Sequence, residues 1–202
     1  MIQSRKDLKK YIAQDRIMNN KKAQHVSMAD MVKSIILPDL VIKYLYLLRK
    51  AEYYNNCHKH CFILSSIYKL MYRHLGTRLG YTIPLNTFGP GLSLPHIGTI
   101  VVNGNAKVGS NCRLHVCVNI GASGGSLEAP KLGDNVYIGP GAILYGDISI
   151  ANNVTIGANA TVNRSCEQEN VVLAGTPAKI VKENYPNWVE FNNVPLDNEK
   201  IK

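Results

Sequence analysis

Two spacings of apolar residues divide the chain of 202 residues. Up to about residue 80, apolar side chains recur every three or four positions, which is the spacing of one face of an α-helix. From residue 82 onward they recur every six positions instead. The change in period predicts a helical N-terminal part followed by a repetitive structure of a different kind.

Three helices are predicted in the first part. A short one covers Arg5 to Met18, and a longer pattern from Asp30 to Tyr54 contains Pro38, which should kink or divide it. A third covers Cys61 to Leu79. The polar stretch 19–27 is predicted to be a linker. The apolar positions of the second pattern are Met31, Ile35, Leu40, Tyr44, Leu47 and Leu48. Those of the third helix are Ile63, Ile67, Leu70, Met71 and Leu75.

Ten consecutive hexads in one phase begin at Val108. They read VGSNCR, LHVCVN, IGASGG, SLEAPK, LGDNVY, IGPGAI, LYGDIS, IANNVT, IGANAT and VNRSCE. The first position is Val, Leu or Ile in nine of the ten, and the fifth is Cys, Val, Ala or Ile in eight. Phe88, Leu94 and either Ile100 or Val102 extend the phase backwards with one slip of two residues. A fixed period of this kind marks a solenoid.

The period has a direct structural interpretation. Three hexads make one coil of three short strands and three tight corners, with the first and fifth residues of each hexad pointing inward. Gly and Asn between them allow the positive φ angles that corners need. Each inward Val, Leu or Ile contributes about 1.5–3 kcal/mol on burial, and stacked coils stabilise one another. We therefore expect a mainly β fold, a parallel β-helix at 82–182, after a basic α-helical domain at 1–81 and before a C-terminal tail at 183–202.

The net charge of +9 belongs to the helical part. Residues 1–81 carry 15 Lys or Arg against 5 Asp or Glu, whereas residues 82–202 carry 8 against 9. Such a basic region could attract an acidic glycan or a membrane surface, or it could be a solvated helical face. Nucleic acid is the least favoured partner, because no basic-aromatic RNA signature or helix-turn-helix pattern accompanies the charge.

The composition is that of a folded protein, with 46% hydrophobic and 18% charged residues. The most apolar stretch, 35–48, is interrupted by Pro38, Asp39 and Lys43 and is too short to span a bilayer. The chain also opens without the apolar stretch of a signal peptide. We expect a cytoplasmic protein, which suits an odd number of cysteines, five, as reduced thiols.

Four stretches of the repetitive half resemble a known family. They are GPGLSLPHIGTIVV (89–102), CRLHVCVNIGASGG (112–125), APKLGDNVYIGPGAILYGDISI (129–150) and the segment from IGANATV to VLAGTPAKIVK (156–182). In order and spacing they are similar to the serine acetyltransferase branch of the hexapeptide-repeat acyltransferases. The resemblance implies a left-handed β-helix, acetyl-CoA as the acetyl donor and a homotrimer. Within this branch, the motifs are most similar to members that O-acetylate sugars of capsules or other surface glycans.

Two histidines are the candidate catalytic residues. Acetyl transfer to a hydroxyl needs a base, and an imidazole titrates near neutrality. The repeat half holds only His96 and His115. In the motif LPHIGT, His96 stands where the family keeps its catalytic base. Counting hexads places Leu94 and Leu114 on the same face of adjacent coils, about 5 Å apart, so both histidines should share one outer corner. His115 could orient His96, hold the acceptor or stabilise the oxyanion, or be a turn residue.

The coenzyme site follows from the resemblance. In the family the pantetheine arm lies in the groove between neighbouring subunits, against small residues. By motif position these would be Gly121, Ala122, Gly139, Pro140, Gly157 and Ala158. Lys179 or Lys182 in AGTPAKIVK could meet a coenzyme phosphate. Each glycine also has a plainer interpretation as a structural corner.

Departures from the family pattern bear on the acceptor. Serine acetyltransferases carry an acidic residue just before the catalytic histidine, where this chain has Pro95. Glu128 and Ala129 replace their Arg-His pair, and the expected acidic partner upstream falls near Tyr81 or Thr82. A buried Glu128 would repel the carboxylate of serine. The departures predict a neutral acceptor, a sugar of a surface polysaccharide or its precursor, with the altered loop 122–131 making room for it.

Parts of the sequence also suit other functions. Serine acetylation in cysteine biosynthesis is the alternative within the same class, and an inactive scaffold is the alternative outside it. A carbonic-anhydrase-like metal site needs three repeat histidines, and only two exist. The cluster Cys57, His58, His60 and Cys61 lacks the second ligand pair of a zinc finger, so no metal is expected. Cys112 falls on an inward position, and Cys117 has no activating context for a nucleophile.

Overall fold

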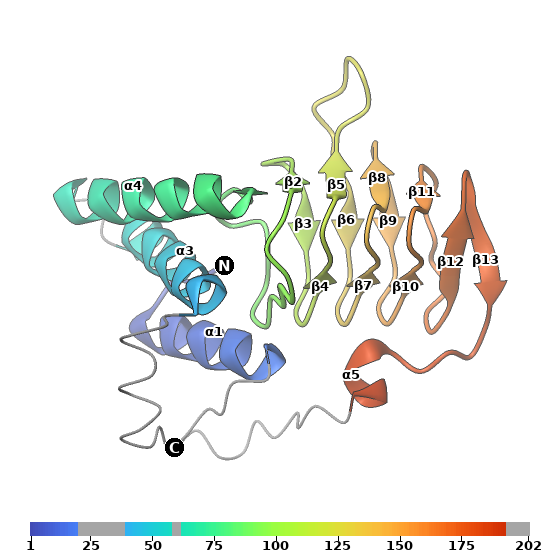
Figure 1. Cartoon of the computed structure of the whole chain (residues 1–202), viewed down its shortest axis with the longest axis horizontal. Coiled ribbons are helices and arrows are strands. Elements are labelled where there is room, and N and C mark those ends of the chain that lie inside the picture. The colour runs from blue at the N-terminus through green and yellow to red at the C-terminus, as the bar shows by residue number, and fades with distance from the viewer. Residues whose placement is uncertain (20–38, 58–61, 193–202) are drawn as a thin grey trace.

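The structure is a computed structural model that describes residues 1–19, 39–57 and 62–192. Three helices, α1 (Arg5–Met18), α3 (Leu40–Cys57) and α4 (Phe62–Leu79), precede a row of short strands (Figure 1). A last helix, α5 (Trp188–Phe191), follows the strands. Helices followed by a repetitive β structure are what the change in period predicts.

Local capping explains where two of the helices begin. The Ser4 hydroxyl accepts a hydrogen bond from the Asp7 amide at 3.0 Å, and α1 has the predicted bounds. The Asp39 carboxylate accepts from the amides of Val41 and Ile42, both at 3.1 Å, at the start of α3. The second pattern is therefore helical from Leu40 onward, and its part before residue 39 lies outside the described residues.

The predicted apolar face of α4 is largely exposed in the structure and not buried. Ile63 and Leu70 are 72% and 71% exposed, and Ile67 and Met71 are also exposed. The buried side of α4 consists of Ser65, Tyr72, Gly76 and Leu79 instead. A Cβ at Gly76 would lie 2.8 Å from the Tyr81 carbonyl oxygen and 3.2 Å from the Tyr44 ring. Close packing at a glycine thus selects this side of α4, and the apolar side remains uncovered in the single chain.

The strands form three sheets, one for each side of a prism. Sheet A contains β1 (Tyr81–Thr82), β2 (Ile100–Val102), β5 (Val118–Gly121), β8 (Ile143–Tyr145) and β11 (Thr161–Val162). Sheet B contains β3 (Lys107–Val108), β6 (Lys131–Leu132) and β9 (Ser149–Ile150). Sheet C contains β4 (Arg113–Leu114), β7 (Tyr137–Ile138), β10 (Thr155–Ile156), β12 (Val172–Gly175) and β13 (Ala178–Lys182). All pairs are parallel except β12 with β13, which confirms the predicted parallel β-helix.

The hexad positions form the core as predicted. The nine apolar first positions and eight apolar fifth positions are at most 8% exposed. Val102 pairs with Ile120, while Ser93 pairs with Arg113, so that Leu94 lies beside Leu114. The slip of two residues therefore lies in the corner between Leu94 and Ile100.

One hexad does not contribute a side of the prism. Leu114 pairs with Ile138, 24 positions later, whereas Ile138 pairs with Ile156, only 18 positions later. The six additional residues leave the prism after β5 as a projecting loop (Figure 1), in which Leu127 is 82% exposed. Because the loop is one hexad long, the six-residue phase of the sequence is the same before and after the loop.

A ladder of asparagine side chains runs along one corner. Asn111, Asn135 and Asn153 all have positive φ, between 56° and 60°. The Asn111 amide donates to Asn135 at 2.9 Å, and Asn135 donates to Asn153 at 2.9 Å. Gln14 of α1 donates to the Asn111 side-chain oxygen at 2.9 Å and so begins the ladder. The corners are thus joined to one another and to the first helix.

Helix α1 also covers the edge of sheet C. Asp15 accepts from the amides of Gly91 and Leu92 at 2.8 and 2.9 Å. The Asn19 side chain donates to the Leu92 carbonyl and accepts from the Leu94 amide, both at 2.9 Å. Since these backbone groups have no neighbouring strand on that side, polar side chains of the helical part satisfy them.

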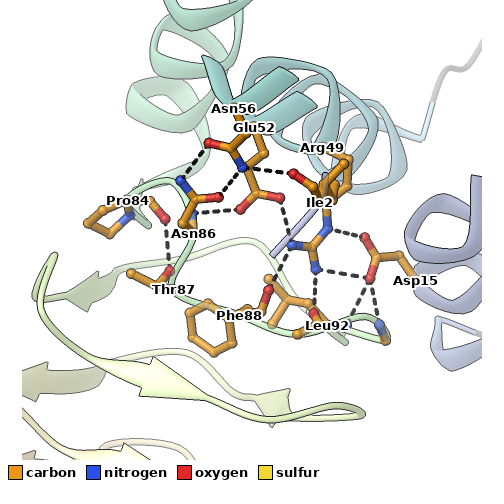
Figure 2. A network of polar contacts seen from close by, with 12 residues as sticks. Ile2, Asp15, Arg49, Glu52, Asn56, Pro84, Asn86, Thr87, Phe88 and Leu92 are labelled. Atoms are coloured by element: carbon orange, nitrogen blue, oxygen red, sulfur yellow. Dashed lines mark hydrogen bonds and ion pairs between the residues drawn. The ribbon is translucent and has the colours of Figure 1, made fainter. Parts of the chain in front are cut away.

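Arg49 lies at the centre of the contact between helices and coils (Figure 2). Its guanidinium is fully buried and makes two bonds to Asp15, at 2.8 and 3.2 Å, and one to Glu52 at 3.0 Å. It also donates to the carbonyls of Phe88 at 3.0 Å and Gly89 at 2.7 Å. All five donors of the side chain are therefore satisfied. This network fixes the segment that leads to His96.

Part of the predicted C-terminal tail is folded onto the body of the protein. Trp188 of α5 is 4% exposed and packs with Val189 against Met18 of α1. The Trp188 indole donates to the Asn111 carbonyl at 2.9 Å. Among the described residues, no helix is long and apolar enough to cross a membrane.

Candidate active site

The corner between sheets C and A carries both candidate histidines. His96 lies in the corner after Leu94, and His115 follows β4 on the next coil. Their ring centroids are 5.7 Å apart, with an angle of 49° between the ring planes. The structure therefore brings the two imidazoles together on one corner, as the phase of the repeat predicts.

The two rings have different surroundings. His96 is exposed, and its imidazole makes no hydrogen bond within the described residues. His115 is half-buried, and its Nε2 atom is buried without a hydrogen-bond partner in the same part of the chain. Burial lowers the pKa of His115, and the nearby Arg113 and His96 lower it further. His115 is thus held in its neutral form near neutral pH, beside an imidazole that is open to a substrate.

Three residues that the sequence did not single out, Arg113, Tyr137 and Trp188, lie beside the histidine corner. The Tyr137 ring lies 5.0 Å from the His115 ring, and Arg113 lies 5.3 Å from the Trp188 ring. Burial lowers the pKa of the Arg113 guanidinium. Arg113 and Tyr137 pair in adjacent strands of sheet C, so the same counting of hexads could have found them. Trp188 lies outside the repeat, so the six-residue period could not predict its position.

Four of the proposed coenzyme residues lie on the same corner as the histidines. Because Leu114, Ile138 and Ile156 are paired, His115, Gly139 and Gly157 follow one another along the solenoid. Pro140 and Ala158 are exposed there. Gly121 and Ala122 lie instead at the end of β5, where the projecting loop begins. The structure thus divides the predicted set between two corners.

Stacking of the coils already explains the glycine at position 139. Gly139 is buried, and a Cβ there would lie 2.8 Å from the Ala158 nitrogen and 2.9 Å from the Ile156 carbonyl oxygen. At Gly157 the nearest atom to a Cβ would be the Ala174 Cβ, at 3.3 Å. Gly139 is therefore required by the fold, whatever its part in coenzyme binding.

The two lysines predicted to meet a phosphate lie on β13, at the far end of sheet C. Both are exposed, and the Lys182 ammonium lies 4.8 Å from the Tyr185 ring. Four strand spacings separate β13 from β4 beside His115, which amounts to about 19 Å. A coenzyme that contacts both a lysine and His96 must therefore lie along the solenoid.

The described residues contain no evident metal site. They contain no group of three or more His, Cys, Asp or Glu side chains that could hold an ion. His58, His60 and Cys61 lie outside them. Cys112 is 1% exposed, which confirms its place in the core, and Cys117 is exposed at the histidine corner with a φ of 62°.

Glu128 does not have the buried position that one part of the sugar prediction assumed. Its side chain is 60% exposed, not buried, and lies 3.9 Å from the Lys131 ammonium in the projecting loop. Solvent and a neighbouring cation both screen its charge. The expected repulsion of a serine carboxylate by a buried Glu128 is therefore absent.

Comparison with known proteins shows that part of the chain is similar to hexapeptide-repeat transferases. Residues 129–164 match the family described as bacterial transferase hexapeptide (six repeats). A serine acetyltransferase of Mycobacterium tuberculosis is 32% identical over 106 residues, which are 52% of this chain and 46% of that protein. The chain therefore spans about half the length of the curated relatives that it matches.

Solved structures of serine acetyltransferases share the fold. That of Neisseria gonorrhoeae superposes with a TM-score of 0.66 at 22% identity, over 91% of this chain and 70% of its own. A serine acetyltransferase in complex with CoA gives 0.61 at 21% identity, over 84% and 68%. The solved structures thus show a common fold, and the curated relatives confirm the resemblance to the serine acetyltransferase branch.

The predicted sugar acceptor and its role in polysaccharide biosynthesis are wrong. The relatives and the solved structures above are serine acetyltransferases, and they favour the alternative acceptor, serine. One premise of that prediction, a buried Glu128, is also wrong, because the loop exposes this side chain. The relatives also lend no support to contact of the basic helices with a membrane or an anionic glycan.

Proposed function

We propose that the protein is a serine O-acetyltransferase, which moves the acetyl group of acetyl-CoA to the hydroxyl of serine. The observation that carries the proposal is the pair of imidazoles on an exposed corner, 5.7 Å apart, in a fold shared with serine acetyltransferases. A CoA complex among those structures supports the donor. A cytoplasmic location stays a prediction.

His96 acts as the general base. Its exposed imidazole takes the proton of the serine hydroxyl as the oxygen attacks the thioester carbon of acetyl-CoA. The tetrahedral intermediate collapses when the carbon–sulfur bond breaks, and the coenzyme sulfur receives the proton from His96. The products are O-acetylserine and CoA, and no cofactor other than the donor takes part.

His115 supports this step as a neutral imidazole. Protonation of His115 would place a second positive charge 5.7 Å from His96 at the moment when His96 accepts a proton. Burial and Arg113 keep the pKa of His115 low and so keep it neutral. Its Nε2 atom is buried and accepts or donates no hydrogen bond in the described residues, so no bond there favours the protonated form. A neutral His115 therefore does not oppose the imidazolium that forms at His96.

The coenzyme site is completed by a second subunit of a homotrimer, with left-handed coils as the resemblance implies. Exposed apolar side chains support assembly: on α4, Ile63 and Leu70, and on the outer face of sheet A, Val101 and Ile143. Acetyl-CoA would lie along the histidine corner, past Pro140 and Ala158. Size-exclusion chromatography with light scattering should give a mass of three chains, and a monomer that binds acetyl-CoA would contradict the shared groove.

Release of CoA with serine as acceptor tests the activity. The purified protein with acetyl-CoA and L-serine should release CoA thiol far faster than without serine. His96→Ala should lower kcat by roughly 10²–10⁴ and leave the melting temperature and acetyl-CoA binding unchanged. His74→Ala, at an exposed histidine of α4, is the matched control and should retain full activity. Turnover with hexoses but not with serine, or full activity of His96→Ala, would overturn the proposal.

A further inference from the structure

The corner that carries His96 is longer than the corner on the next coil. Five residues, 95–99, connect Leu94 to Ile100, whereas three residues, 115–117, connect Leu114 to Val118 on the next coil. Leu94 lies beside Leu114, and Ile100 pairs with Val118. Two residues of this corner therefore have no counterparts on the next coil, and contacts with other parts of the protein must fix the path of the backbone.

Those contacts come from the junction between α4 and β1. The Tyr81 hydroxyl donates to the carbonyl oxygen of His96 at 2.7 Å, and the Gly98 amide donates to the Leu79 carbonyl at 3.2 Å. Tyr81 is 5% exposed, and its ring packs edge-on against the Tyr44 ring of α3 at 5.1 Å. Burial raises the pKa of Tyr81 to about 12, so the hydroxyl keeps its proton and remains a donor.

The direction of the His96 ring depends on this main-chain anchor. The imidazole is exposed and makes no hydrogen bond in the described part of the chain, so no side chain there orients it by such a bond. We propose that Tyr81 is a positioning residue, which aims the His96 imidazole at the acceptor by holding the carbonyl group of the same residue. The inference rests on the proposed function, in which His96 is the base.

Tyr81→Phe removes only the hydroxyl and keeps the packed ring. It should lower kcat by about 10- to 100-fold, because a small misplacement of a catalytic group is costly. The KM for acetyl-CoA should not change. Because the lost bond is to the carbonyl group and not to the imidazole, the midpoint of the pH dependence of kcat/KM should also stay at the wild-type value.

Tyr44→Phe is the matched control. Its ring belongs to the same cluster, but its hydroxyl is buried without a hydrogen-bond partner in the described residues. This variant should keep wild-type kcat. Loss of activity in Tyr44→Phe equal to that in Tyr81→Phe would show that packing, and not the hydroxyl, is responsible, and would overturn the inference.

The two proposals fail in different ways. If His96→Ala is inactive but Tyr81→Phe keeps wild-type kcat, the proposed function stands and Tyr81 is not a positioning residue. If the wild-type protein shows no turnover with serine, NMR of ¹³C-labelled histidine rings still decides on Tyr81. Tyr81→Phe should then shift the His96 resonance, assigned with His96→Ala, and leave the His74 resonance in place. An unchanged His96 resonance would overturn the inference.

Discussion

Replacement of Arg49 by methionine should destabilise the whole protein. The variant leaves the carboxylates of Asp15 and Glu52, each 2% exposed, buried without their cation. Removal of one partner of a buried ion pair costs about 3–5 kcal/mol. Against a total stability of about 5–15 kcal/mol, that loss is a large fraction. For a chain of this size it corresponds to a fall in melting temperature of about 6–20 °C.

The loss should also depend on pH, because it arises from uncompensated negative charge. Acid neutralises the two carboxylates in the variant, so the difference in melting temperature from wild type should shrink as the pH is lowered. Thermal unfolding followed by circular dichroism at several pH values measures both quantities. Arg73→Met, at an exposed arginine of α4, is the control and should change the stability by less than about 0.5 kcal/mol.

Two results would refute this reasoning. A melting temperature of Arg49→Met equal to that of Arg73→Met would mean that the network in Figure 2 contributes nothing net. A large loss that stays constant as the carboxylates are protonated would point to lost packing instead of charge. Arg49→Lys should lie between wild type and Arg49→Met, because an ammonium keeps the charge but supplies three donors instead of five.

Three further predictions concern the coils. Gly139→Val should unfold the C-terminal coils, seen as loss of the thermal transition, because the new side chain meets backbone within 3.0 Å; an unchanged transition would contradict the register. Asn135→Ala should lower the free energy of unfolding in urea by about 1–3 kcal/mol. Asn135→Gly also removes the two ladder hydrogen bonds but tolerates the positive φ. Equal losses of stability in the two variants would assign the effect to the hydrogen bonds, and a smaller loss in Asn135→Gly would assign it to the backbone conformation. Because the pKa of His115 is lowered on folding, the unfolded chain binds the proton more readily, and stability should fall as the pH drops through about 6.5. His115→Asn should flatten that slope below about pH 6.5, and an equal slope would exclude His115 as its source.

The repeat could be predicted from sequence because its information is local. Each hexad carries its own inward residues, so Ile138 or Val154 is assigned to the core without knowledge of any partner. The same counting located the histidine corner. It could not show that the hexads at 120–131 contain a loop, because a loop of one repeat length leaves the phase unchanged.

The helical part was harder because its contacts join distant residues. The three-residue spacing of α4 gave a helix but not its orientation, which depends on Gly76 fitting against Tyr44 and Tyr81. Arg49 belongs to a region of high positive charge, yet it is fully buried between residues 34 positions before it and 40 after it. Tyr81 stands out in the sequence only as a position that lacks a carboxylate.

The polar side chains of α1 on the edge of sheet C have a consequence for the length of the assembly. A β-solenoid with two open ends can grow by stacking end to end, as fibres do. Here Asp15 and Asn19 occupy the hydrogen-bonding groups of the first coil, and β13 reverses direction to cover the last strand of the same sheet. Sheet C is thereby covered by polar side chains of α1 at one end and bordered by the lysine-bearing β13 at the other, and both features disfavour the addition of another chain to this sheet.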